Sequence, residues 1–178
     1  MPERTVSSRR EFEGRLLSLR VDDVELESGR RTTREVVEHP GAVAILAWDG
    51  ERLAAVRQWR QAAGAELLEI PAGTLEPGES PLVTAQRELG EECGLTAASW
   101  EAGPAFYTAP GFSTELLTLF LATELSSVNA APPEDEALER AWITLGDALA
   151  SIEDGRIRDA KSLVGILWLA RHLAPAES

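Results

Sequence analysis

The stretch GTLEPGESPLVTAQRELGEECGL, which runs from Gly73 to Leu95, decides the fold of this chain. Its second half predicts a helix from Ser80 to Cys93. Ser80 has a side chain suited to capping a first helical turn, and the proline that follows it suits that turn as well. Gly94 stands where a helix ends in a left-handed residue. The stretch therefore reads as a turn-rich loop followed by a helix with both ends marked.

The predicted helix is unusually acidic. Glu88 and Glu92 are four positions apart, so their carboxylates share one helical face, and Glu91 lies alongside. Like charges at this spacing destabilise a helix by roughly a few tenths of a kcal/mol per pair, and Gly90 costs about 1 kcal/mol relative to alanine. The alternative interpretation is a solvated acidic face. Conflicts between local preference and structure often mark functional sites, and the spacing favours that interpretation here.

The charged residues follow a fixed spacing. From Gly73 there are five residues to Glu79, seven more to Arg87-Glu88-Leu89, one to Glu91-Glu92, and one to Gly94-Leu95. This arrangement resembles the Nudix box at every defined position. The resemblance implies a Nudix hydrolase, an enzyme that cleaves a nucleoside-diphosphate-linked compound with the help of divalent metal ions.

The acidic helix suits that chemistry. Diphosphate hydrolysis requires neutralisation of phosphoryl oxygens and an activated water, and Mg²⁺ prefers carboxylate and carbonyl oxygens. Glu88 and Glu92 supply carboxylates on one face. By resemblance, Glu91 adds another, the main-chain carbonyl of Ala72 also binds metal, and two or three Mg²⁺ ions take part, with Mn²⁺ as a substitute. In that scheme Arg87 pairs with nearby carboxylates such as Glu79.

A second loop points to the substrate. Pro110 stands fifteen positions after Leu95, within TAPGFSTE from Thr108 to Glu115. This run resembles the ADP-ribose pyrophosphatase branch, although Pro-Gly also marks ordinary turns. The resemblance implies hydrolysis of ADP-ribose to AMP and ribose 5-phosphate, with Pro110, Gly111 and Glu115 at the substrate.

Further site residues are expected outside the box. Arg34 and Arg60 are candidates for phosphate or ribose oxygens, which the planar guanidinium suits; the alternative is a surface arginine. By resemblance the general base comes from an acidic loop beyond the box, and we expect Glu134 in this role, with Glu136 as the second candidate. The alternative is a solvated acidic loop. Glu115 is another candidate for the base, although we expect it to help bind metal or substrate.

Base recognition is the least determined part of the expected site. Relatives in this branch often stack an aromatic side chain from the N-terminal region on the base. Phe12 is the candidate there, and Trp59 is a second one unless it belongs to the core.

Outward from the box, the pattern predicts an α/β fold, an α/β/α sandwich with a mixed sheet. An N-terminal antiparallel strand pair, Phe12–Leu26 and Arg31–Val37, precedes it. Residues 1–40 are thus expected to form a strand extension and residues 41–178 the Nudix hydrolase domain. Ala42–Trp48 reads as a buried strand, and Asp49-Gly50 as a hairpin turn to a partner strand over Arg52–Arg60. Further strands are predicted at 66–70, 100–107, 115–122 and 138–143, and helices at 145–151 and 159–172. By resemblance the chain forms a homodimer through the N-terminal strands.

Composition limits the partners. The net charge of −13 over 178 residues argues against nucleic acid, and no apolar run is long enough for a membrane span or a signal core. The expected location is cytoplasmic. Cys93 is the sole cysteine, next to two glutamates, and reads as a small filler side chain. Two rival functions remain: hydrolysis of another nucleoside-diphosphate sugar or a dinucleotide, and a non-catalytic ADP-ribose sensor.

Overall fold

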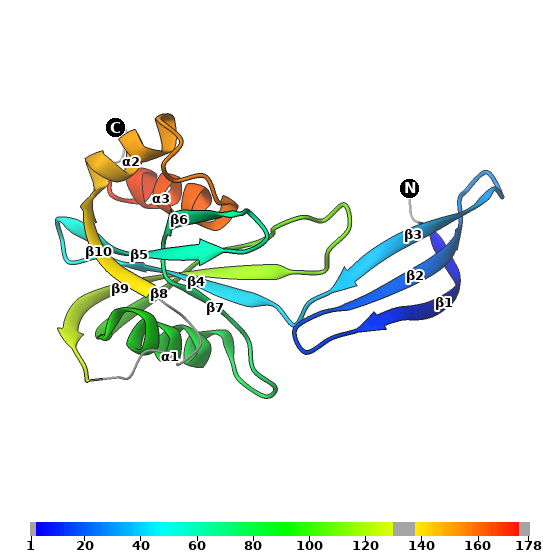
Figure 1. Ribbon diagram of the computed structural model, residues 1–178, viewed down its shortest axis with the longest axis horizontal. Helices are drawn as coiled ribbons and strands as arrows, with labels where there is room; N and C mark the ends of the chain where they lie inside the picture. Colours follow the sequence, from blue (N-terminus) through cyan, green and yellow to red (C-terminus); the bar gives the residue numbers. More distant parts are fainter. Residues whose placement is uncertain (1–2, 130–137, 175–178) are drawn as a thin grey trace. The chain divides into compact units, whose positions relative to one another are not determined.

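The computed structural model describes residues 3–129 and 138–174 (Figure 1). The chain packs as two compact units. The first consists of Met1–Gly41 with Phe106–Leu116, and the second of Ala42–Ala105 with Leu117–Ser178. No helix in the described part of the chain is long and apolar enough to cross a membrane.

The first unit is an antiparallel sheet of three strands, in the order β1 (Arg4–Glu13), β2 (Ser18–Glu25) and β3 (Arg31–Glu38). The predicted strand pair was wrong in number, and Phe12–Leu26 is not one strand. The chain turns between β1 and β2, where the Gly14 N–H donates to the Leu17 carbonyl at 2.9 Å. β1 was missed because every residue in it is exposed and most are polar, so it carries no alternating apolar signal.

The segment Phe106–Leu116 also belongs to the first unit. Val37 of β3 donates its N–H to the Phe112 carbonyl at 2.7 Å and accepts the N–H of Thr114 at 2.9 Å. These bonds hold the Pro-Gly turn against the end of β3. The sequence interpretation placed only residues 1–40 in the N-terminal part, because hydrogen bonds between distant segments leave no local pattern.

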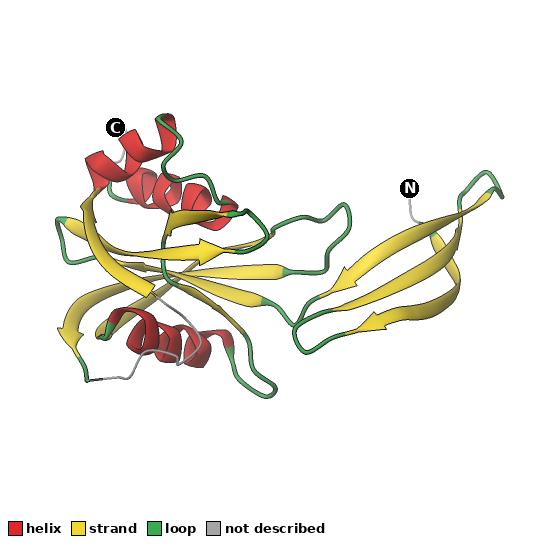
Figure 2. Cartoon of the chain, in the orientation of Figure 1, coloured by secondary structure: helices red, strands yellow, loops and turns green. Residues whose placement is uncertain are grey.

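The second unit holds two sheets between helices (Figures 1 and 2). One sheet is antiparallel and has the order β10 (Leu138–Thr144), β5 (Arg52–Arg60), β6 (Ala65–Glu69). The other has the order β7 (Ala72–Thr74), β4 (Ala42–Ala47), β9 (Leu116–Ser127), β8 (Leu95–Tyr107). It is mixed, because β4 pairs with β9 in parallel and with β7 antiparallel. Helix α1 (Pro81–Cys93) lies on one side, and α2 (Leu145–Glu153) and α3 (Ala160–His172) lie on the other. The predicted α/β arrangement is confirmed.

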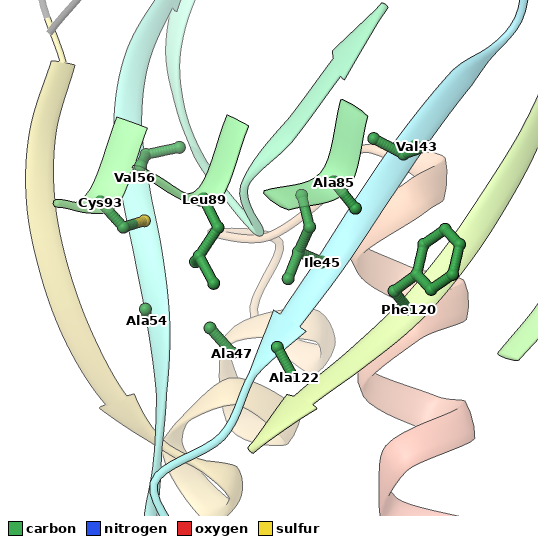
Figure 3. Close-up of a cluster of buried hydrophobic side chains, with 10 residues drawn as sticks. All are labelled: Val43, Ile45, Ala47, Ala54, Val56, Ala85, Leu89, Cys93, Phe120 and Ala122. Atoms are coloured by element: carbon green, nitrogen blue, oxygen red, sulfur yellow. The ribbon is translucent and has the colours of Figure 1, made fainter. Parts of the chain in front are cut away.

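Strand β4 is the centre of the core, and all six of its residues are buried. Val43, Ile45 and Ala47 join a cluster with Ala85 and Leu89 of α1 (Figure 3). The opposite face meets α3, where a Cβ built on Gly165 would lie 3.3 Å from Leu46. Because both faces are covered, the continuous apolar run of this strand was a correct signal for a buried strand.

The Asp49-Gly50 turn joins β4 to β5, but the two strands do not form the predicted hairpin. Asp49 Oδ1 accepts the N–H groups of Glu51 at 2.9 Å and Arg52 at 2.6 Å, and Gly50 has a φ of 102°. Beyond one bridge between Trp48 and Leu53 the strands separate. The prediction was wrong because a strand has two hydrogen-bonding edges, and β4 uses both of them for β7 and β9.

Candidate active site

Helix α1 begins and ends where the sequence predicted. Ser80 has extended backbone angles, and its side chain accepts the N–H of Val83 at 3.4 Å. At the other end Gly94 is left-handed, with a φ of 63°, and its N–H donates to the Gly90 carbonyl at 2.9 Å. The two caps fix where the helix begins and ends.

Two carboxylates lie on the buried face of α1. Glu88 is 9% exposed and Glu92 is 3% exposed, on the same side as the fully buried Leu89. A buried carboxylate is costly unless it is hydrogen-bonded or paired with a cation. The interpretation of these glutamates as a solvated acidic face is therefore wrong, and their partners define the site.

Both carboxylates reach the backbone of β7. Glu92 Oε2 accepts the N–H of Ala72 at 2.9 Å. The carboxyl group of Glu88 lies against Gly73, where a built Cβ would be only 1.9 Å from Glu88 Cδ. A side chain at position 73 has no room, which is the physical reason for glycine there. The structure thus brings Ala72, Glu88 and Glu92 together.

Arg87 connects these glutamates to the preceding loop. Its Nη1 donates to Glu88 Oε1 at 2.8 Å and to Glu91 Oε2 at 3.0 Å. Its Nε and Nη2 donate to the two carboxylate oxygens of Glu79, each at 3.1 Å. The predicted pairing of Arg87 with Glu79 is confirmed. A guanidinium fork thus holds the loop to the helix.

The ionisation of this group follows from its hydrogen bonds. Hydrogen bonds from Arg87, and then from the hydroxyl of Thr84, lower the pKa of Glu79 to about 2. The Glu79 carboxylate in turn raises the pKa of Arg87 above its ordinary value, and Glu88 and Glu91 act in the same direction. Glu79 and Arg87 are therefore both charged at neutral pH.

Cys93 is not a nucleophile in this environment. Burial, followed by the charge of Glu92, raises the pKa of its thiol to about 12. The side chain packs in the apolar cluster with Leu89 and Val56 (Figure 3). The interpretation of Cys93 as a filler side chain agrees with this placement.

The donor set fits a divalent cation. Within residues 3–129 and 138–174, no three His, Cys, Asp or Glu side chains already surround one metal position. Arg87 Nη1 lies between Glu88 and Glu91, so a positive group already occupies the space between two carboxylates. Carboxylate oxygens beside a backbone strand, with no side chain at Gly73 to exclude an ion, are donors that hard divalent cations prefer.

Arg60 lies in a different polar group. Its Nε and Nη2 bind both oxygens of Glu69, with Nη2 2.7 Å from Oε2. Lys161 also contacts Glu69, and Asp159 accepts from Lys161 at 2.9 Å. Sequence reasoning missed Glu69 and Lys161. The available signals were a glutamate directly after the apolar pair Leu67-Leu68 and the sole lysine of the chain.

The remaining candidates lie in the first unit. Glu115 accepts from the Thr108 hydroxyl and has His39 Nδ1 3.7 Å from its Oε1. Pro110 and Gly111 form the turn closed by the Ser113 N–H donating to the Ala109 carbonyl at 2.9 Å. Arg34 donates from Nε to Glu3 at 3.0 Å.

Four further residues were named from the sequence. Glu134 and Glu136 lie outside the described residues. The aromatic candidates Phe12 and Trp59 are 55% and 58% exposed, so Trp59 is not a core residue. The indole N–H of Trp59 donates to Gln61 Oε1 at 2.9 Å.

Comparison with known proteins shows two matching family models. The model described as NUDIX domain matches residues 38–164, and one described as nucleoside diphosphate sugar hydrolase N-terminal domain matches residues 3–37. The first match covers the acidic helix and both sheets of the second unit.

Individual relatives match along nearly the whole chain. An ADP-ribose pyrophosphatase from Bacillus subtilis (strain 168) is 44% identical over 172 residues, which cover 95% of this chain and 93% of that protein. A methanol dehydrogenase activator from Bacillus methanolicus is 43% identical over 170 residues, which cover 94% and 92%. A solved structure described as an ADP compounds hydrolase has a TM-score of 0.87 over 97% of this chain and 95% of its own. At 22% identity, that structure shows the fold alone.

Gly73→Ala should weaken the binding of divalent metal. The added Cβ would lie 1.9 Å from Glu88 Cδ, so the carboxylate must leave its position against β7. Calorimetric titration with Mg²⁺ should show an affinity lower by about tenfold. Gly146→Ala is the matched control, because its Cβ would meet only Thr144 Oγ1 at 3.9 Å. Equal affinities in the two variants would contradict a role for Glu88 at the metal.

The low pKa of Glu79 predicts a pH-dependent stabilisation. Folding lowers this pKa from 4.5 to about 2, so the charged carboxylate stabilises the fold above pH 4.5, and this stabilisation is lost as the pH falls towards 2. Glu79→Gln should lower Tm at pH 6. The difference in Tm between this variant and the parent protein should shrink as the pH falls from 4.5 to about 2. Carboxyl carbon-13 NMR should place the Glu79 midpoint near 2; a midpoint near 4.5 would show that Arg87 does not hold it.

Proposed function

This chain belongs to the Nudix family, and on that basis we propose that it hydrolyses the diphosphate of ADP-ribose to AMP and ribose 5-phosphate. The observation that carries the proposal is the convergence of Glu88 and Glu92 on the β7 backbone at Ala72 and Gly73. The 44% identity to a protein named ADP-ribose pyrophosphatase, over 95% of this chain, supports the choice of substrate.

The residues of α1 would hold the divalent metal that Nudix hydrolases require. We assign Glu88, Glu91, Glu92 and the carbonyl of Ala72 to this role, with Mg²⁺ as the ion and Mn²⁺ as a substitute. When bound, the cation neutralises phosphoryl oxygens and makes water easier to deprotonate. The charge of Arg87 reduces the repulsion between Glu88 and Glu91. Its Nη1 donates to Glu88 Oε1 at 2.8 Å and to Glu91 Oε2 at 3.0 Å, which restrains both side chains.

Arginines and the Pro-Gly turn are assigned to the substrate. Arg60 and Arg34 carry planar guanidinium groups suited to phosphate or ribose oxygens. Pro110, Gly111 and Glu115 are assigned to substrate contact on the strength of their likeness to the ADP-ribose pyrophosphatase branch. The Thr108 hydroxyl, which donates to Glu115, holds that carboxylate in one orientation.

We propose that the chain forms a homodimer through the surface of the first unit. Every residue of β1 is exposed, and in the described part of the chain β1 pairs with β2 alone, which leaves one edge of the sheet open. Val6 and Phe12 add exposed apolar area to this strand. Sedimentation of the intact chain should give twice the monomer mass, and a monomer at micromolar concentration would remove the proposal.

The cytoplasmic location stays a prediction.

A second candidate is a different diphosphate substrate, such as another nucleoside-diphosphate sugar or a dinucleotide. A relative from Streptomyces rubellomurinus favours keeping it, because that protein is 29% identical over 157 residues and is named as a hydrolase of a CMP-linked phosphonate. Both candidates use the same carboxylates of α1 and differ only in the groups that recognise the base and the second half of the substrate.

Product analysis of a substrate panel separates these candidates. The panel is ADP-ribose, GDP-mannose, UDP-glucose, NADH, diadenosine polyphosphate and an oxidised guanine triphosphate, each with Mg²⁺. We expect AMP chiefly from ADP-ribose. Glu92→Gln should lower the rate at least about 100-fold, whereas Glu51→Gln, an exposed carboxylate of the β4–β5 turn, should retain it. Faster cleavage of another diphosphate would replace ADP-ribose as the proposed substrate. Binding of ADP-ribose without cleavage would indicate a sensor.

Glu134 is the proposed general base, with Glu136 as the second candidate. Glu134→Gln should lower kcat by about 10² to 10⁴-fold, because proton removal from the attacking water is lost. KM and Tm should stay close to those of the parent protein. Near-normal turnover would remove Glu134 from the mechanism, and the same measurement on Glu136→Gln would then decide the second assignment.

A further inference from the structure

A cluster of four charged side chains, of which Glu69 is buried, joins β5, β6 and the start of α3. Its members are Arg60, Glu69, Asp159 and Lys161, here called the Glu69 cluster. The Glu69 side chain is 1% exposed. Arg60 holds it from one side, with Nε 3.0 Å from Oε1 and Nη2 2.7 Å from Oε2, and Lys161 contacts Oε2 from the other side. Two anions and two cations balance.

The carboxylate of Glu69 is charged in spite of its burial. Burial is the largest influence and acts to raise its pKa, but the hydrogen bonds and charges of Arg60 and Lys161 together keep the pKa below its ordinary value. A carboxylate buried this deeply and bonded by two cations has little freedom to reorient. The guanidinium that it binds through two nitrogen atoms is therefore fixed as well.

The cluster is anchored to α3 by further hydrogen bonds. Asp159 is the N-cap of α3, and its Oδ2 accepts both the Ser162 N–H at 3.1 Å and the Lys161 ammonium at 2.9 Å. Ser162 Oγ accepts the N–H of Ile70 at 2.9 Å. The first turn of α3 is thus fastened to the side chain of Glu69 and to the backbone that follows it.

We propose that Glu69, held by Lys161, is a positioning residue that fixes the guanidinium of Arg60 for the oxyanions of the diphosphate substrate. This inference rests on the proposed function and on Arg60 as a substrate contact. A guanidinium has five N–H donors and can hold a carboxylate on one edge while it presents another edge to an anion. The Arg60 side chain is 38% exposed, so it extends from the buried carboxylate towards solvent.

Lys161 has a specific part in this arrangement. Lys161 draws on the same oxygen, Oε2, and so leaves Arg60 more of its positive charge for the substrate. Asp159 accepts from the Lys161 ammonium at 2.9 Å and so keeps it beside Glu69.

A double-mutant cycle tests whether Glu69 acts through Arg60. KM and kcat would be measured for Arg60→Gln, Glu69→Gln and the double variant, with the diphosphate that the parent protein cleaves best. Each single change should raise KM about tenfold, with a smaller change in kcat. The double variant should resemble Arg60→Gln alone, because Glu69 has nothing left to position. Effects on KM that multiply would overturn the inference.

Lys161 provides a second cycle that does not depend on the folding of Glu69→Gln. Lys161→Met should raise KM about threefold in the parent background and leave it unchanged in the Arg60→Gln background. Lys161→Arg should restore KM by restoring the cation. Asp154→Asn, which breaks the exposed Arg156 pair, is the control and should leave KM unchanged. A loss of Tm without this dependence on Arg60 would show a merely structural role.

The same measurements separate this inference from the proposed function. If the parent protein cleaves no diphosphate, the proposed function and the inference fail together. If it cleaves one, and the cycles with Glu69 and Lys161 show independent effects on KM, the inference fails alone.

Discussion

The contact between the carboxylates of α1 and the backbone of β7 is the constraint on which the candidate site depends. Glu88 and Glu92 are buried, and burial of an anion is tolerated only with donors or cations in reach. The N–H of Ala72 supplies one donor, and the missing side chain of Gly73 supplies the space. The helix can approach β7 only with glycine at that position.

The apolar core sets how closely α1 and β7 approach each other. Strand β4 packs Val43 and Ile45 against α1 and also pairs with β7, with Val43 opposite Gly73. One buried strand therefore positions both the helix that carries the carboxylates and the backbone that they contact. Interiors of this kind are close-packed and transmit small displacements, so a change in the size of Leu89 would be felt at Glu88.

The sequence revealed the parts of the molecule whose signals are local. The caps of α1 and the apolar run of β4 are short patterns, and both predictions were confirmed. The separation of β4 from β5 could not be predicted, because the two edges of β4 are taken by strands far away in the chain. Lys161 lies 92 positions from Glu69, so their contact left no pattern to read.

The four residues from Glu69 to Ala72 show why the second unit positions its site so firmly. Glu69 is bound by Arg60 and Lys161, and the N–H of Ile70 donates to Ser162 of α3. The Pro71 carbonyl accepts the N–H of Ile45 at 2.8 Å, and the N–H of Ala72 donates to Glu92.

These residues are thus tied to β5, α3, β4 and α1, and the helices on both sides of the sheets meet in one short segment. Buried hydrogen bonds of this kind are costly to leave unmade, so the backbone at Ala72 cannot move without disturbing α1, α3 and β4 together. A carbonyl ligand for a metal requires that kind of fixed backbone, since a main-chain oxygen cannot adjust by rotating a side chain. Placement of Ala72 next to the carboxylates of α1 therefore depends on the contacts of Glu69 as well as on the acidic helix itself.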